Sequence, residues 1–270
     1  MRLLSAADVE TRAVYRSMAT IPRLPRIAGL RADLSDPVQA DAAVVGTSTL
    51  FLLTGNEPGF ARTQITVVEA ARQRGVRHIV KLSALGASDH SHSSIARDHW
   101  QVEQAIQQST IPWTFLRPHA FMQNWLGDLA ESVRQESAIY SPIGDGRVPF
   151  IDTRDIAAVA AQVLRNPAPH AGKKYFLTGG EAVGYQDVAD ALSEATGRTI
   201  VYRPITMEEA RARMVRSGVQ PGLIEATLAI AAYQQGGGAT AIVSPSVERL
   251  LGRSPRSIRD FARDYVAAFR

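Results

Sequence analysis

Residues 75–86, Gly75-Val76-Arg77-His78-Ile79-Val80-Lys81-Leu82-Ser83-Ala84-Leu85-Gly86, decide the fold class of this chain. Gly75 ends a helical stretch over residues 61–74, and the apolar, β-branched run 78–82 predicts a short buried strand. A helix that turns sharply into a buried strand is typical of α/β proteins. The first expectation is therefore an α/β fold.

The alternation of strands and helices continues on both sides of this stretch. The predicted elements are, in order, strands at 11–15 and 27–32, a helix at 37–45 after the cap candidates Asp33 and Ser35, a strand at 49–53, a helix at 95–109 and a strand at 113–116. Such strands pair in parallel through right-handed crossovers. The order predicts a Rossmann-like, doubly wound parallel sheet.

The alternation loosens after Pro118. Helices are predicted at 121–134, 153–164, 184–197, 206–217, 223–233 and 257–269, and strands at 148–151 and 174–178. We expect a Rossmann-like nucleotide-binding domain over residues 1–165, with residues 121–147 on its substrate side. Residues 166–270 are expected to form a small carboxy-terminal substrate lobe.

No glycine-rich turn precedes the first predicted strand. Dinucleotide-binding folds need that turn because only glycine lets the backbone approach the pyrophosphate at a helix amino terminus. Residues 2–8 are typical of the second half of a helix, so residues 11–15 take the place of a second strand. We expect the first strand and its turn to be absent, through a late start, a shortened chain or a real loss of cofactor binding. Unpaired edges would then lower the melting temperature.

Composition narrows the class of protein. The 270 residues include no cysteine, which excludes disulfides and a thiolate nucleophile, and 30 basic against 26 acidic residues give a net charge of +4. The arginines are spread along helices, which favours a solvated surface over nucleic-acid binding. His90 and His92 lack acidic or cysteine partners at ligand spacing, so we expect no metal site. We expect a cytoplasmic monomer or homodimer without a membrane span.

Several phrases together resemble the NmrA-like atypical short-chain dehydrogenases, in particular the bacterial NAD(P)H-binding members related to NADPH quinone oxidoreductases. The phrases are residues 31–37, 51–54, 75–86, 116–118 with 121–124, and 150–157. The resemblance covers nearly the whole chain. It implies a nucleotide-binding Rossmann domain and a small lobe that closes over a small-molecule substrate.

The resemblance implies cofactor-binding residues at the strand ends. Arg16 lies where the family recognises the adenosine ribose or its 2′-phosphate, and a guanidinium there favours NADP over NAD; the alternative is a solvated loop arginine. Asp33 and Leu34 match the pair that borders the adenine, unless Asp33 only caps the next helix. Thr54, Gly55 and Ser83 end two strands and would face the ligand, or they only form turns.

His99 and Glu103 are the candidate catalytic residues. Typical short-chain dehydrogenases use a tyrosine and a lysine one helical turn apart, but the corresponding helix here has His99 and Glu103. A carboxylate beside an imidazole would raise the pKa of His99 and give a proton donor near neutral pH. The alternative is a helix-surface pair that only stabilises the helix.

The substrate side is expected to include Phe121, Gln123 and Asn124, although aromatic residues at this spacing also occur in cores. Three functions stay open. The first is an NAD(P)H-dependent oxidoreductase that reduces a quinone or another small carbonyl compound. The second is a non-catalytic, NAD(P)-sensing regulator. The third is a cofactor-free isomerase or cyclase on the same fold.

Overall fold

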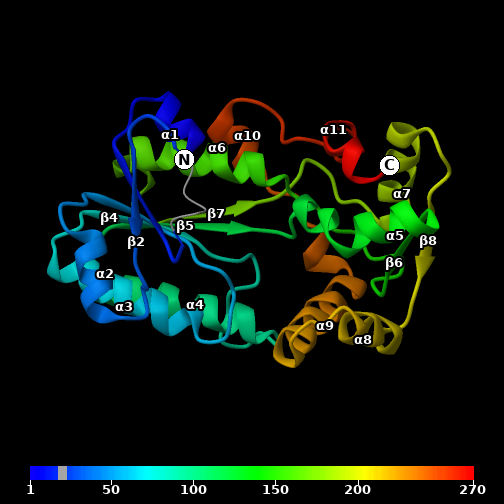
Figure 1. Cartoon of the computed structure of the whole chain (residues 1–270), viewed down its shortest axis with the longest axis horizontal. Coiled ribbons are helices and arrows are strands. Elements are labelled where there is room, and N and C mark those ends of the chain that lie inside the picture. The colour runs from blue at the N-terminus through cyan, green and yellow to red at the C-terminus, as the bar shows by residue number, and fades with distance from the viewer. Residues whose placement is uncertain (18–22) are drawn as a thin grey trace. The chain divides into compact units, whose positions relative to one another are not determined.

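The computed structural model describes residues 1–17 and 23–270 and contains two compact units (Figure 1). One unit comprises residues 1–89, 95–117 and 157–175, and the other comprises residues 90–94, 118–156 and 176–270. The chain thus passes between the units several times. The proposed domain boundary at residue 165 stays a prediction.

The strands of the first unit from β1 to β5 pair in parallel, as predicted. β1 (Thr11–Tyr15) pairs with β2 (Ile27–Arg31). A second sheet has the order β3 (Thr49–Leu52), β4 (His78–Leu82), β5 (Trp113–Pro118), β7 (Lys173–Leu177), in which β3, β4 and β5 run parallel. In the described part of the chain, β1 pairs only with β2 and β3 only with β4. The expected absence of a first strand before β1 stays a prediction.

Three helices cover one side of the second sheet: α2 (Pro37–Val44), α3 (Phe60–Gln73) and α4 (Ser94–Gln108). Figure 1 shows them on one side of β4 and β5, and α6 (Thr153–Arg165) on the other side. Their apolar side chains meet the strands in one core, in which Val67, Ile79 and Phe115 are buried. The short helix α1 (Arg2–Ala6) precedes β1. Helices on both sides of parallel strands confirm the doubly wound α/β fold.

The helix α2 begins at Pro37, as predicted, but its cap is Asp36. The carboxylate of Asp36 accepts a hydrogen bond from the backbone nitrogen of Val38 at 2.9 Å and caps the helix. Asp33 and Ser35, the predicted caps, are therefore wrong for this role. Pro37 explains the choice, because proline is favoured at the first helical position and places the cap just before it.

The second unit consists of short strands and helices around an aromatic core. Its elements are α5 (Asp128–Glu136), β6 (Ala138–Ser141), α7 (Tyr185–Thr196), β8 (Val201–Pro204), α8 (Met207–Arg216), α9 (Pro221–Gln235), α10 (Ser246–Leu251) and α11 (Ile258–Asp264). The ring of Trp125 lies 4.9 Å from that of Phe150 and 5.3 Å from that of Phe261. These contacts join residues far apart in the sequence.

The sequence predictions for this unit need five corrections. The predicted helix 121–134 is interrupted at Gly127, which separates a 3-10 turn at Met122–Leu126 from α5. The predicted strand 148–151 forms only isolated bridges, and the predicted helix 257–269 ends at Asp264 before another 3-10 turn. The parallel pair β6 and β8 and the helix α10 were not predicted. Each strand of that pair has only four residues, too few for a clear hydrophobic period.

Candidate functional site

The loops that follow β1, β2 and β3 meet at one edge of the first unit. Arg16 follows β1, and its guanidinium forms an ion pair with the carboxylate of Glu57 in the loop after β3. This hydrogen bond and the charge of Glu57 raise the pKa of Arg16, with a smaller contribution from Asp33 after β2. The carboxyl ends of the strands therefore bring these polar groups together, which is where open α/β sheets bind ligands.

Asp33 and Leu34 have local structural partners. The carboxylate of Asp33 accepts hydrogen bonds from the hydroxyl of Ser35 at 2.7 Å and from its backbone nitrogen at 2.9 Å, and these bonds lower the pKa of Asp33. The backbone nitrogen of Asp33 donates to Gln39 at 3.0 Å. Leu34 packs against the core under the helices. Contact of either residue with an adenine stays a prediction.

A chain of buried polar contacts runs inward from Thr54 at the end of β3. The side-chain nitrogen of Gln64 on α3 donates to the Thr54 hydroxyl at 2.7 Å. The oxygen of the same amide accepts from the ammonium nitrogen of Lys81 on β4 at 2.8 Å. That nitrogen also lies 3.1 Å from Nδ1 of His99 on α4. The loop after β3 is thus joined to residues of β4 and α4.

Glu103 contacts residues other than the predicted His99. Its carboxylate accepts from the hydroxyl of Ser83 at 2.6 Å and from two nitrogens of Arg117 at 2.9 and 2.5 Å. Glu103 has no exposed surface and Ser83 only 4%. Ser83 therefore has a buried carboxylate partner at the end of β4, and the three residues form one network.

The expected behaviour of His99 is wrong in both of its forms. The ring is 6% exposed, so His99 and Glu103 are not a helix-surface pair. Burial, followed by the charges of Lys81 and Arg117, lowers the pKa of His99 to about 3 instead of raising it. The spacing does place both residues on one face of α4, but that face packs onto the sheet, where a charged imidazole loses its hydration.

Lys81 is a further buried residue of this site that was not predicted from the sequence. It interrupts the apolar strand 78–82 at a position where alternation puts it on the same face as Ile79. A lysine on the inward face of a buried strand is rare unless it is paired. A basic residue inside an otherwise apolar strand is thus the sequence signal that points to Lys81.

The predicted substrate residues lie in the second unit with different exposures. The amide of Gln123 donates to Asp152 at 2.9 Å and accepts from the backbone nitrogen of Thr153 at 2.8 Å, so it holds the turn before α6. Phe121 is partly buried and its backbone bridges Ile151, whereas Asn124 is exposed. A role for these residues in substrate binding stays a prediction.

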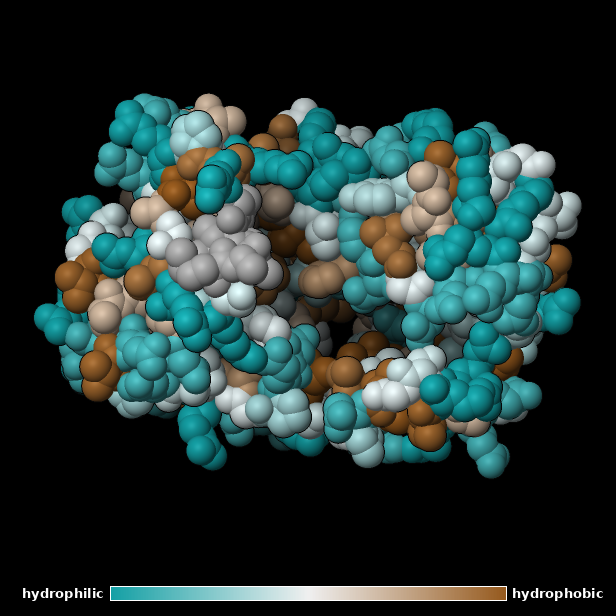
Figure 2. Space-filling view, in the orientation of Figure 1, coloured by the Kyte–Doolittle hydropathy of each residue, from teal (hydrophilic) through white to brown (hydrophobic). Residues whose placement is uncertain are grey.

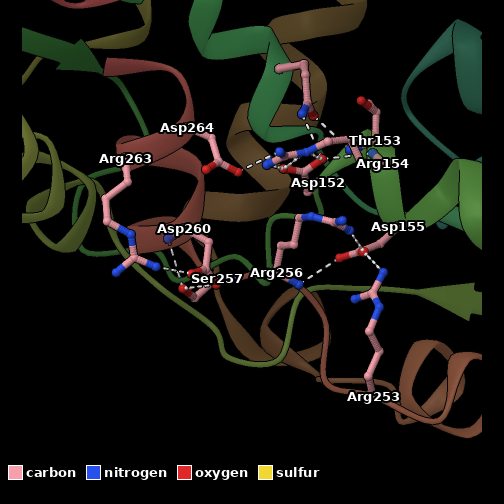
Figure 3. A network of polar contacts seen from close by, with 11 residues as sticks. Asp152, Thr153, Arg154, Asp155, Arg253, Arg256, Ser257, Asp260, Arg263 and Asp264 are labelled. Atoms are coloured by element: carbon pink, nitrogen blue, oxygen red, sulfur yellow. Dashed lines mark hydrogen bonds and ion pairs between the residues drawn. The ribbon is translucent and has the colours of Figure 1, made fainter.

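The turn before α6 and its first residues are joined to the carboxy-terminal segment by ion pairs (Figure 3). Arg154 bridges Asp152 and Asp264, at 2.6 Å to each carboxylate. The fully buried carboxylate of Asp155 accepts from Arg253 at 2.6 Å and from the backbone nitrogen of Arg256 at 2.7 Å, and it pairs with the Arg256 guanidinium. This network fixes the segment around α11 within the second unit.

An apolar surface is exposed on α9 and the segment after it. Leu223, Ile230 and Tyr233 on the helix are 44%, 39% and 58% exposed, and Ile242 and Val243 follow at 65% and 40%. Figure 2 shows hydrophobic surface over this helix. Exposed apolar surface of this kind is typical of sites that bind apolar molecules. Among the described residues, none of the helices has both the length and the apolar character needed to cross a bilayer.

The chain is similar to several proteins that are named as nucleotide-dependent reductases. It is 34% identical to the NAD(P)H azoreductase of Xenophilus azovorans, over 100% of this chain and 94% of that protein. The triphenylmethane reductase of Citrobacter sp. in complex with NADP(H) is similar in structure, with a TM-score of 0.85 and 26% identity over 98% of this chain and 93% of that one.

A third similarity is to the NADPH-dependent quinone oxidoreductase of Escherichia coli in complex with NADPH. Its TM-score is 0.84, with 25% identity over 94% of this chain and 89% of that chain. The model of the NmrA-like family matches residues 2–258. The fold, the order of the motifs and this match agree, and the chain belongs to the NmrA-like family.

Proposed function

We propose that this chain is an NAD(P)H-dependent reductase of a small apolar acceptor, a quinone or another carbonyl compound. The observation that carries the proposal is the meeting of the loops after β1, β2 and β3 around the exposed guanidinium of Arg16. The relatives named above are an azoreductase, a triphenylmethane reductase and a quinone oxidoreductase. They favour an enzyme over a regulator that binds the cofactor without turnover.

The residues at this edge fit the ribose end of the cofactor. The side chains of Arg16 and Glu57 are 72% and 59% exposed, so their ion pair is weak and the guanidinium can exchange it for a phosphate. The fork of an arginine donates two parallel hydrogen bonds to a phosphate dianion. We therefore assign NADP as the preferred cofactor, with Arg16 at the 2′-phosphate and Thr54 and Gly55 beside the ribose.

When bound, the nicotinamide supplies the hydride, so the protein has to bind and orient the cofactor and the substrate and to exclude water from them. In this proposal the neutral ring of His99 keeps a proton on Nε2, since Nδ1 faces the Lys81 ammonium. His99 then acts as a hydrogen-bond donor, and Glu103 holds Ser83 and Arg117 in place.

Substrate binding is assigned to the second unit. Asn124 offers an exposed amide, and the apolar surface of α9 can accept a flat, poorly hydrated molecule. Phe121 completes the proposed set with a partly buried ring. A small-molecule acceptor of this kind is consistent with the aromatic dyes and quinones in the names of the relatives.

Coenzyme binding to the Arg16→Ala variant tests the proposal. Loss of a charge-assisted hydrogen bond of about 2 kcal/mol should weaken NADPH binding roughly 30-fold and leave NADH binding nearly unchanged. Arg77→Ala is the matched control, because Arg77 is exposed at the amino end of β4. Dissociation constants from nicotinamide fluorescence give the comparison. Equal losses for the two coenzymes would refute the NADP assignment, and NADPH binding without oxidation by any quinone would favour the regulator.

A further inference from the structure

We propose that Lys81 is a positioning residue for the cofactor, because its buried ammonium orients Gln64 and through it the hydroxyl of Thr54 at the carboxyl end of β3. This inference rests on the proposed function, since Thr54 belongs to the assigned cofactor edge. The juxtaposition that carries it is the continuous chain of contacts from Thr54 through Gln64 to Lys81 and His99.

Lys81 has the surroundings of a charged group although it has no exposed surface. Its nitrogen lies 2.8 Å from the side-chain oxygen of Gln64, 3.0 Å from the carbonyl oxygen of Leu82 and 3.1 Å from Nδ1 of His99. An ammonium group has three hydrogens, one for each of these acceptors. A neutral amine has two, and its lone pair would then face one of the acceptors. The geometry therefore favours the ammonium.

His99 can accept because it is neutral. Burial and the charges of Lys81 and Arg117 lower the pKa of the imidazole to about 3, so the ring is neutral at neutral pH. The Lys81 ammonium nitrogen lies 3.1 Å from Nδ1, which favours the tautomer that carries its proton on Nε2 and accepts at Nδ1. The ring of Phe60 on α3 packs 5.0 Å from the imidazole and helps to exclude water. Glu103, which lies on α4 as His99 does, is the negative charge that acts on Lys81.

The charge on Lys81 sets the direction of every hydrogen bond in the chain. An amide has an oxygen side and a nitrogen side, and the ammonium can only bond to the oxygen of Gln64. The nitrogen side must then point to Thr54, whose hydroxyl oxygen accepts at 2.7 Å. The Thr54 hydrogen is left for the carbonyl of Gly55, at 3.1 Å. Without the ammonium, the Gln64 amide can reverse and Thr54 loses its fixed orientation.

Proton loss from Lys81 makes this arrangement dependent on pH. Burial lowers the pKa of Lys81 to about 7, and the charge of Glu103 acts in the opposite direction. Lys81 faces Gln64 from α3, His99 from α4 and the carbonyl of Leu82 on its own strand. The charged group that acts on it is Glu103 of α4, whose carboxylate is paired with Arg117 of β5. The oriented state is thus populated at pH 6 and is lost as the pH rises through about 7.

The test compares Lys81→Met and Gln64→Met with the full chain in NADPH binding at pH 6 and pH 8.5. Each variant should bind NADPH about tenfold more weakly than wild type at pH 6. The double variant should be no weaker than either single one, because the two residues act through one chain of contacts. Lys173→Met is the matched control, since Lys173 is an exposed lysine of β7. Thermal unfolding shows whether Lys81→Met folds, and Gln64→Met carries the same prediction with Lys81 intact.

A measurement without cofactor separates this inference from the proposed function. The side-chain amide resonance of Gln64, assigned by its loss in Gln64→Met, should shift with a midpoint near the Lys81 pKa of about 7 and stay constant in Lys81→Met. A Gln64 signal that ignores pH in wild type, or additive losses of affinity in the double variant, would overturn the inference. If wild-type protein binds no NADPH but the Gln64 resonance shifts with pH as expected, the assignment of NADP as cofactor is refuted and the orienting role of Lys81 is retained.

Discussion

Replacing His99 by asparagine should make the protein less sensitive to acid. The pKa of His99 is about 3 in the folded protein, against an ordinary value of 6.5 that applies when the chain unfolds. Between these values the unfolded chain binds a proton that the folded chain does not, so the free energy of unfolding falls as the pH decreases from 6.5 towards 3. Asparagine retains an acceptor for Lys81 and does not titrate.

The magnitude follows from the two pKa values. Proton uptake by the unfolded chain between pH 7 and pH 5 lowers the wild-type free energy of unfolding by about 2 kcal/mol on account of His99 alone. His119, whose pKa burial lowers to about 4, adds a decrease of the same sign that the variant keeps. The variant should therefore lose about 2 kcal/mol less than wild type over this range.

Urea unfolding at pH 7 and pH 5, followed by circular dichroism, measures this difference. His92→Asn serves as the control, because His92 is exposed in the loop before α4 and should leave the wild-type dependence in place. If His99→Asn loses as much stability between the two pH values as wild type, the imidazole is not the buried neutral group described here. Parallel turnover measurements with a quinone would show whether the predicted catalytic role of His99 exists.

Two further predictions concern the ion pairs. Asp155→Asn removes the fully buried carboxylate between Arg253 and Arg256 and should lower the free energy of unfolding by about 2 kcal/mol. The control Glu248→Gln, on the exposed side of α10, should change the free energy of unfolding by less than about 0.5 kcal/mol. Equal melting curves for the two variants would contradict a structural role for this network. Arg117→Met leaves the charge of Glu103 buried without its partner and should lower the free energy of unfolding by about 3 to 5 kcal/mol. Adding Glu103→Met should restore part of this loss, as measured by the same urea titration. A double variant that is less stable than Arg117→Met would argue against a buried charge as the cause.

The regular part of the first unit was predictable from local patterns. The helix α3 has a long amphipathic period ended by Gly75, and the buried strand β4 follows it directly, so type and position both came from neighbouring residues. The second unit was harder. β6 and β8 are short and pair across about 60 residues of sequence, so no local period announces them. The cap of α2 was misplaced because three polar residues precede Pro37 and only one can take the position.

The candidate site divides in the same way. The motifs located the ends of β3 and β4 and named Thr54, Ser83, His99 and Glu103, since strand ends and helical spacing are properties of sequence. The sequence did not predict which of these side chains contact one another, because α3 and α4 bring several polar groups to one buried layer. Glu103 meets Arg117 instead of His99, and His99 meets Lys81.

The sequence alone was enough to predict the parallel α/β architecture, the family and the edge at which polar groups gather. These predictions came from the hydrophobic period, the turn residues and the order of the motifs, which can all be read along the chain without knowing how it packs. The charge states of the buried groups are not local properties. Whether an imidazole gains or loses a proton depends on its burial and on which charges lie within a few ångströms, and both are settled by the packing of α3 and α4 onto β4.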